Sequence, residues 1–405
     1  MSASKSPLVM IPGPTELDAS VLEALGEPSM AHADPRLIEH FGRSLELMRD
    51  VFQCKAGQPL ILTASGTIGW DVIAANLVEP GQRALVVTNG YFGDRFRDCL
   101  EAYGVATTAL TSQPGTAPTV DEITAALSAA GSSHFSLVTL THVDTSSGVL
   151  TDIKACAAAI RAAQPNALIA VDGVCSIGGE ELRMDEWGVD VAFTASQKAI
   201  GCPAGLALMV LGERAMAAFN DRVARKVPVT GWYASLANWL PIMKAYEARQ
   251  PSYFATPAVN LIVALHKALD NLVGFPGGLS ALFARQVLAS DAFKAGIAAM
   301  GLTLVPKTHA SAAHLLSAIR FPQGVGAGDL VPKVRARGAV ITGGLLAPIK
   351  TEYFRVGHMG VSALQASRDD LLVTLRAIEG ALIELGVAGV TAGAAEAAFN
   401  SVLRK

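Results

Sequence analysis

Short runs of apolar residues alternate along this chain with longer segments in which apolar positions recur every three or four residues. The first pattern is typical of buried strands and the second of helices that pack on one face. Between residues 60 and 215 the apolar runs predict seven strands: Leu60–Thr63, Ala84–Thr88, Ala106–Leu110, Ser136–Thr141, Ala167–Val171, Val191–Thr194 and Leu206–Leu211. Helices are predicted between several of them, at Ile68–Leu77, Arg95–Tyr103, Val120–Ala130 and Ile153–Ala163. This alternation indicates an α/β domain with a mainly parallel sheet, whose functional sites lie at the carboxyl ends of the strands.

The two ends of the chain follow other patterns. Residues 1–20 contain Pro7, Pro12, Gly13 and Pro14, and because proline fixes φ and lacks an N–H, we expect an extended arm rather than a central strand. A helix is predicted at Leu37–Phe52. Beyond residue 261, helices are predicted to about residue 300, followed by strands at Leu302–Leu304, His314–Arg320, Ala339–Ile341 and Tyr353–Val356 and a last helix at Ser367–Leu385. We therefore predict an arm (1–20), a large α/β domain (21–260) and a smaller α+β domain (261–405).

Composition narrows the class of protein. Hydrophobic residues make up 51% of the 405 residues and charged residues 17%, which indicates a large buried core. The formal net charge of −3 does not favour a nucleic-acid or membrane partner, and no apolar run has the length of a membrane helix. Five widely spaced cysteines without a CxxC motif argue against disulfides and against a metal site. With no recognisable targeting signal, the cytoplasm is the default expectation, and a peroxisome or mitochondrion stays open.

Two ionisable residues follow neighbouring predicted strands. Asp172 ends the run from Ala167, and Lys198 follows the run from Val191 within the sequence Ser-Gln-Lys. A carboxylate and an amine at one rim of a sheet are the pair that pyridoxal phosphate (PLP) chemistry requires. The amine binds the cofactor as a Schiff base, and the carboxylate keeps the pyridine nitrogen protonated. Either residue alone has a commoner interpretation, an Asx turn for Asp172 and a solvated amine for Lys198.

A third element is the segment TASGTIGW, which follows a predicted strand and opens a predicted helix. Its residues Ser65, Gly66 and Thr67 provide hydroxyls and backbone N–H groups at a helix start, an arrangement that binds phosphate. An ordinary helix cap has the same composition. Trp70, the last residue of this segment, is predicted to be a core residue and not a catalytic one.

The segments HVDTSSGVL, LIAVDGVCSIGGEEL and DEWGVDVAFTASQKAIGCPAGLAL resemble the class V, fold-type I PLP-dependent aminotransferases. The segments MIPGPTEL, SGTIGWD, TNGYFGDR, PSYFATPAVNLI and YFRVGHMG fit the same family, so the resemblance covers nearly the whole chain. More narrowly, the chain is similar to alanine–glyoxylate and serine–glyoxylate (serine–pyruvate) aminotransferases. The resemblance implies PLP as cofactor and the fold-type I architecture.

The resemblance also implies a role for each candidate site residue. Lys198 would carry the cofactor and move protons, and Asp172 would pair with the pyridine nitrogen. The phosphate would be held by the loop residues Ser65, Gly66 and Thr67 and by Gln197. The ring would contact Thr145 near its hydroxyl and Phe92 on its face, where the family often has tryptophan.

Five more residues take roles by the same resemblance. Tyr253 and Thr256 would reach the phosphate of the neighbouring subunit, which would make a homodimer obligatory for a complete site. Arg355 would bind the substrate carboxylate, since a guanidinium can bind a carboxylate through two hydrogen bonds. Gly13 would approach the substrate through its backbone, and His32 would contribute at the subunit interface with lower weight.

Three functions are compatible with these residues. The first is transamination from L-alanine to glyoxylate, with serine as donor or pyruvate as acceptor left open. The second is a cysteine desulfurase-like lyase, which needs a mobile nucleophilic cysteine and usually has histidine where this chain has Gln197. The third is a non-catalytic binding protein, although such a protein has no need of Asp172, Lys198 and Arg355 together.

Overall fold

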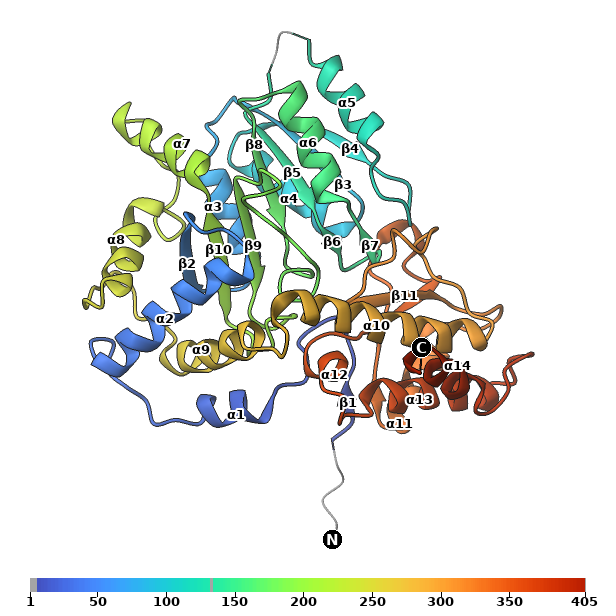
Figure 1. Cartoon of the computed structure of the whole chain (residues 1–405). Helices are drawn as coiled ribbons and strands as arrows, with labels where there is room; N and C mark the ends of the chain where they lie inside the picture. The colour runs from blue at the N-terminus through green and yellow to red at the C-terminus, as the bar shows by residue number, and fades with distance from the viewer. Residues whose placement is uncertain (1–5, 132–133, 405) are drawn as a thin grey trace.

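The computed structural model describes residues 6–131 and 134–404 of the chain. Its largest feature is a sheet of seven strands in the order β2-β10-β9-β8-β5-β3-β4 (Figure 1). The strands are β2 (Gln58–Thr63), β3 (Arg83–Thr88), β4 (Ala106–Thr111), β5 (Leu137–Thr141), β8 (Leu168–Asp172), β9 (Val191–Ala195) and β10 (Leu206–Leu211). β10 is antiparallel to both of its neighbours, and the other pairs are parallel. The predicted α/β fold with a mainly parallel seven-stranded sheet is confirmed, and each predicted run overlaps one strand.

Burial explains where these elements form. β5, β8, β9 and β10 are buried at every position, whereas the edge strand β4 has no buried position. The helices α3 (Ile68–Asn76), α5 (Val120–Ala129) and α6 (Ile153–Ala163) lie where they were predicted. α4 (Tyr91–Ala102) starts earlier than the predicted residue 95. The reason is tertiary, because the Asp144 carboxylate accepts hydrogen bonds from the N–H groups of Phe92 and Gly93 in its first turn.

The C-terminal part is a smaller α+β unit. Its antiparallel sheet has the order β11-β14-β13, formed by β11 (Leu316–Arg320), β13 (Thr342–Gly343) and β14 (Tyr353–Gly357). A second hydrophobic core joins this sheet to the helices α10 (Gly278–Ala299), α11 (Ala327–Ala336), α13 (Asp370–Glu384) and α14 (Ala394–Leu403). The predicted strand at 302–304 is wrong, because Leu304 forms only an isolated bridge with Ile319 in a segment that otherwise bends. α14 was not predicted, since its alanine-rich sequence has a weak apolar pattern.

The N-terminal arm is held by the C-terminal unit. β1 (Leu8–Val9) pairs in parallel with β12 (Ala339–Val340), and Met10 is 1% exposed within the second core. The backbone then passes so close to β14 that a Cβ on Gly357 would lie 2.2 Å from the carbonyl oxygen of Ile11. The arm continues into α1 (Ala19–Leu25), which packs on α9 (Val259–Val273). The domain boundaries at residues 20 and 260 remain predictions, and the buried residues of α9 belong to the core of the large sheet.

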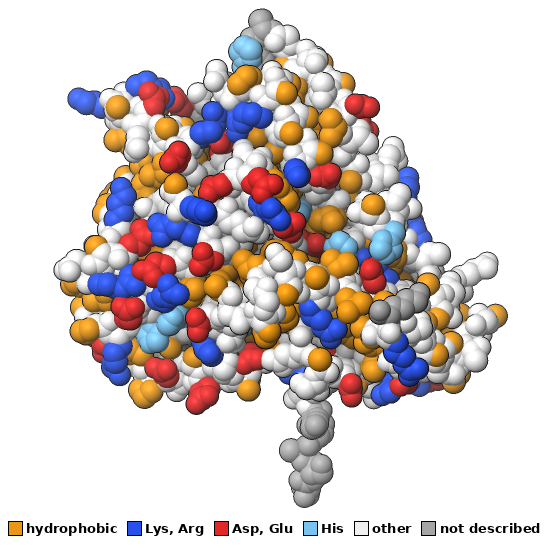
Figure 2. Space-filling model, viewed as in Figure 1, with side chains coloured by type: hydrophobic (Ala, Val, Ile, Leu, Met, Phe, Trp, Pro, Cys, Tyr) orange, Lys and Arg blue, Asp and Glu red, His pale blue; other side chains and the backbone are white. Residues whose placement is uncertain are grey.

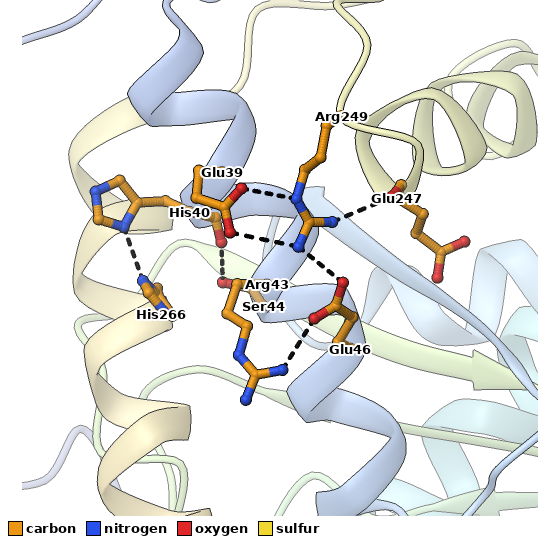
Figure 3. A network of polar contacts seen from close by, with 8 residues as sticks. All are labelled: Glu39, His40, Arg43, Ser44, Glu46, Glu247, Arg249 and His266. Carbon is orange, nitrogen blue, oxygen red and sulfur yellow. Dashed lines mark hydrogen bonds and ion pairs between the residues drawn. The ribbon is translucent and has the colours of Figure 1, made fainter.

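A polar network ties α9 to α2 (Pro35–Val51) and to the segment after α8 (Leu236–Glu247), as Figure 3 shows. Arg249 binds Glu39 and Glu46 with N–O distances of 2.8 and 2.7 Å. The Nδ1 atoms of His40 and His266 lie 2.7 Å apart in a hydrogen bond. This network fixes the helices on which α1 and the arm rest.

The remaining elements are short or peripheral: β6 (Val143–Asp144), β7 (Val149–Leu150), α7 (Glu213–Ala224), a 3-10 turn (Ala347–Ile349) and α12 (Val361–Leu364). Basic and acidic side chains are interspersed over the face shown in Figure 2. Among the described residues, no single helix is long and apolar enough to cross a membrane, and α9 and α10 meet that test only as a pair bent by 86°.

Candidate active site

The carboxyl edge of the large sheet brings together segments that are distant in the sequence. β8 ends at Asp172, β9 ends at Ala195 just before Lys198, and β5 ends just before the segment that contains Thr145. β2 is antiparallel to β10 and therefore runs in the same direction as β9, so its end at Thr63 lies at this edge too. Four loops that carry predicted site residues thus meet at one place.

A cavity of about 200 Å³ opens between these loops. It is lined by Ser65, Gly66, Thr67, Trp70, Phe92, Val143, Thr145, Asp172, Val174, Cys175, Gln197 and Lys198. The structure therefore brings together all the predicted cofactor-binding residues except Tyr253 and Thr256. Among the described residues, no group of three or more His, Cys, Asp or Glu side chains could hold a metal ion.

Asp172 lies at the bottom of this cavity and is 3% exposed. Its Oδ1 accepts a hydrogen bond from the Val174 N–H (3.0 Å), and its Oδ2 accepts one from the indole N–H of Trp70 (2.9 Å). Burial raises the pKa of Asp172 to about 6, and the two hydrogen bonds oppose that shift. A buried carboxylate that still ionises near neutral pH is suited to hold a proton on a bound nitrogen base.

The Lys198 side chain extends to the N-terminal arm. Its amine donates a hydrogen bond to the carbonyl oxygen of Pro12. Burial lowers the pKa of Lys198, which favours the neutral amine. A neutral amine is the form that attacks a carbonyl carbon and accepts a proton. Gly13, with φ of +89°, lies directly against this side chain, and a Cβ there would be 2.5 Å from Lys198 Cδ.

The phosphate loop has the geometry of an anion cradle. The hydroxyls of Ser65 and Thr67 lie 2.5 Å apart, and α3 begins at the next residue, so the positive end of the helix dipole lies at this end of the cavity. Gly66 has no room for a side chain, since a Cβ would lie 2.9 Å from that of Ala195. The buried amide oxygen of Gln197 has no hydrogen-bond partner among the described residues, so this amide is available to a bound molecule.

Phe92 and Thr145 also line the cavity. Phe92 is partly buried, and its ring centroid lies 6.5 Å from that of Trp70. The Asp144 carboxylate fixes the Phe92 backbone, as described for α4, and also accepts a hydrogen bond from the Ser146 N–H (2.9 Å). A flat aromatic face therefore lies at a fixed position beside Asp172.

Arg355 does not line the cavity itself but lies behind one of its walls. Its Nη1 donates to the carbonyl oxygen of Thr145 (3.2 Å) and its Nε to that of Gly343 (3.0 Å). The side chain is 8% exposed, and burial lowers its pKa. Among the described residues it forms no ion pair, so its guanidinium can still bind a carboxylate from outside the chain.

The structure does not bring Tyr253 and Thr256 into this cavity. Tyr253 is 60% exposed, its hydroxyl lies 3.2 Å from that of Thr256, and its ring packs against exposed His32. The nearby Ala258 N–H donates to the hydroxyl of Thr63, so this segment lies on the surface beside the strand end that leads to the phosphate loop.

Sequence reasoning missed four side chains that line the cavity, namely Trp70, Val143, Val174 and Cys175. Trp70 is buried in the core, as expected, and its indole N–H also donates a hydrogen bond to Asp172. The sequence does contain a signal that Val174 and Cys175 line the site. Both lie in the loop directly after Asp172, at the edge of the sheet where the cavity opens.

Comparison with known proteins shows to which family this chain belongs. The profile described as Aminotransferase class-V matches residues 15–355. The chain belongs to this family. It is 40% identical over 365 residues to alanine–glyoxylate aminotransferase 1 of Saccharomyces cerevisiae, which covers 88% of this chain and 92% of that protein. It is 29% identical to serine–glyoxylate aminotransferase of Methylorubrum extorquens over 100% of this chain and 98% of that protein.

A solved structure has the same fold. The ureidoglycine–glyoxylate aminotransferase of Bacillus subtilis superposes with a TM-score of 0.89 at 26% identity, over 100% of this chain and 99% of that one. The chain is therefore a fold-type I aminotransferase, and its cofactor is PLP. The cavity fits this cofactor, with hydroxyls and a helix start for the phosphate, an unpaired amide, Asp172 for a ring nitrogen and Lys198 for the aldehyde.

Substituting Gly13 tests whether the arm shapes this site. In Gly13→Ala the new Cβ must displace the Lys198 side chain, and a displacement of about 1 Å lowers kcat/KM for transamination by roughly 100-fold. Gly324→Ala is the matched control, because Gly324 also has a positive φ (+80°) but no atom within 4 Å of an added Cβ. Equal losses in the two variants would mean that backbone strain alone is responsible.

Proposed function

We propose that this enzyme transfers the amino group of L-alanine to glyoxylate, giving pyruvate and glycine. The observation that carries the proposal is a small cavity beside a buried, unpaired guanidinium, Arg355. Because the cavity of about 200 Å³ must also accommodate PLP, the site favours substrates with a carboxylate and at most a small side chain. The 40% identity to the alanine–glyoxylate enzyme of yeast supports the choice of alanine and glyoxylate. Serine–glyoxylate or serine–pyruvate transamination is the alternative, because one hydroxyl discriminates weakly.

In this proposal each site residue has a defined task. Bound PLP supplies the electron sink that stabilises negative charge at the substrate Cα. The Lys198 amine accepts the proton from that carbon, and the Asp172 carboxylate keeps a proton on the pyridine nitrogen. Arg355 binds the substrate carboxylate and thereby orients the Cα–H bond toward Lys198.

The other residues hold the cofactor. The loop Ser65–Thr67 and Gln197 would hold its phosphate, and Phe92 would contact its ring. Thr145 would form a hydrogen bond with the ring hydroxyl or with an atom next to it. The backbone of Gly13 closes the substrate side, where a larger residue would displace Lys198.

A cysteine desulfurase-like reaction is disfavoured by the state of the thiols. Burial raises the pKa of Cys54, Cys99, Cys156 and Cys202 to about 12 and also raises that of Cys175. Such thiols carry almost no thiolate at neutral pH, and a desulfurase needs a reactive thiolate on a mobile segment.

A panel of amino donors with glyoxylate as acceptor tests the proposal. We expect L-alanine to give the highest kcat/KM, with L-serine lower by roughly tenfold or more. The purified enzyme with PLP should absorb visible light, and Lys198→Ala should be colourless and inactive. Faster reaction of L-serine would establish the alternative, and sulfide release from L-cysteine would establish the lyase. A wild-type protein that stays colourless with PLP would contradict the transaminase and the lyase alike.

Arg355→Ala tests the carboxylate-binding role. We expect kcat/KM for amino and keto acids alike to fall by about 100-fold, because a charged hydrogen bond to the substrate is lost. Arg320→Ala is the control, since Arg320 lies on the paired strand β11 but is partly exposed and bound to Glu352. Unchanged kinetics in Arg355→Ala would remove this residue from the site.

We also propose that the active form is a homodimer in which Tyr253 and Thr256 complete the partner's phosphate site. Both lie on the surface outside their own cavity, and the neighbouring Trp232 is 75% exposed, an unusual position for a large aromatic residue. Burial against a second copy would remove these aromatic rings from water.

Mixed dimers test the shared site. Lys198→Ala and Tyr253→Ala subunits, each inactive or impaired alone, should regain activity when co-expressed, because one site of each hybrid contains neither substitution. Random pairing limits the recovered activity to about a quarter of the wild-type value. No recovery in hybrids that are shown to be dimeric would place Tyr253 outside the partner's site.

A further inference from the structure

The bond between Trp70 and Asp172 joins two parts of the site that are 102 residues apart in the sequence. Among the described residues, the Asp172 carboxylate has two hydrogen-bond donors, the Trp70 indole and the Val174 backbone. The backbone donor belongs to the same tight turn as Asp172. The indole is the only one of the two that comes from a different element of the fold.

Packing holds the indole in one orientation. Trp70 is 8% exposed and stacks on Phe96, with ring centroids 5.8 Å apart and planes inclined by 16°. Phe96 in turn meets the ring of Phe193 on β9 edge-on at 6.1 Å. Gly69 lets α3 press against that strand, because a Cβ there would lie 2.4 Å from Phe193. The N–H of Trp70 therefore cannot turn away from Asp172 without disturbing a packed aromatic stack.

The charges around Asp172 do not by themselves favour its ionised form. Burial and the nearby Asp144 raise its pKa, whereas Lys198 lowers it through its positive charge. Burial lowers the pKa of Lys198 as well, so this opposing charge is weakened. Hydrogen bonds to the carboxylate are then the main interactions of the protein that keep it charged.

Trp70 also connects the two ends of the cofactor site. It lies in the first turn of α3, directly after the phosphate loop Ser65–Thr67. The same short helix therefore carries the start that faces the phosphate and the donor that faces Asp172. A shift of α3 would alter the phosphate end and the nitrogen end together.

We propose that Trp70 is a positioning residue, whose indole N–H orients the Asp172 carboxylate and keeps it ionised for the cofactor nitrogen. The inference rests on the proposed use of Asp172 and PLP, and not on the identity of the amino donor. Phenylalanine would preserve the stacking but remove the donor. Such a variant should keep the fold and weaken the function of Asp172.

The first test uses the cofactor-free protein. The chain has four tryptophans, so an NMR spectrum of ¹⁵N-labelled indole groups contains at most four side-chain signals. The signal absent from Trp70→Phe is that of Trp70, and we expect it to shift with pH around pH 6 as Asp172 takes up a proton. In Asp172→Asn this shift should disappear. A Trp70 signal that does not respond to pH, or that still responds in Asp172→Asn, would overturn the proposal.

The second test uses the PLP-bound protein without substrate. Loss of a hydrogen bond to the carboxylate raises the pKa of Asp172. The midpoint of the acid-induced change in visible absorption should therefore rise by about one pH unit in Trp70→Phe. Adding Trp70→Phe to Asp172→Asn should cause no further change, because the two residues act together. Additive changes would mean that Trp70 acts on the cofactor by another route.

Trp239→Phe is the matched control. Trp239 is also buried, and its indole donates to a backbone carbonyl, that of Tyr233, at 2.5 Å. This variant loses an equivalent hydrogen bond, so its stability falls, but the pH midpoint should stay at the wild-type value. An equal shift in both variants would overturn the proposal. If L-alanine is not the best amino donor but the Trp70 signal shifts with pH as expected, the proposed substrates are contradicted and the role of Trp70 is still supported.

Discussion

The site depends on the burial of one carboxylate, that of Asp172, away from water at the end of a central strand. Asp172 is the last residue of a strand that is buried at every position, so its charge must be stabilised by the protein. The turn at Val174 and the indole of Trp70 do this with two hydrogen bonds. The same burial makes the carboxylate a strong partner for a protonated nitrogen, because the interaction is not screened by solvent.

The second constraint is the path of the N-terminal arm. The arm is fixed by a parallel strand pair with β12 and by insertion of Met10 into the C-terminal core. It then brings the backbone of Pro12 and Gly13 against Lys198, which belongs to the large sheet. The C-terminal unit therefore positions the Lys198 side chain through the arm, and it positions Arg355 through β14.

Local pattern predicted the large sheet well, because its strands, except the edge strand β4, are largely buried on both faces and appear as continuous apolar runs. The pattern failed where tertiary contacts decide the element. The start of α4 depends on Asp144, and the segment at 302–304 has strand-like residues but only one bridging partner. α8 contains Pro241, which in sequence argues against a helix, yet its apolar face packs on α2 and β2.

The sequence by itself determined the chemistry that follows each strand: Asp172, Lys198 and the Ser65–Thr67 loop stand directly after apolar runs, and strand direction places them at one edge. Only the tertiary structure decided that Trp70 donates to Asp172, that Gly13 leaves room for Lys198, and that Arg355 is buried without an ion-pair partner. These facts depend on contacts between residues about 100 to 200 positions apart. No local periodicity encodes such contacts, because they arise from how the helices, the arm and the C-terminal unit pack on the sheet.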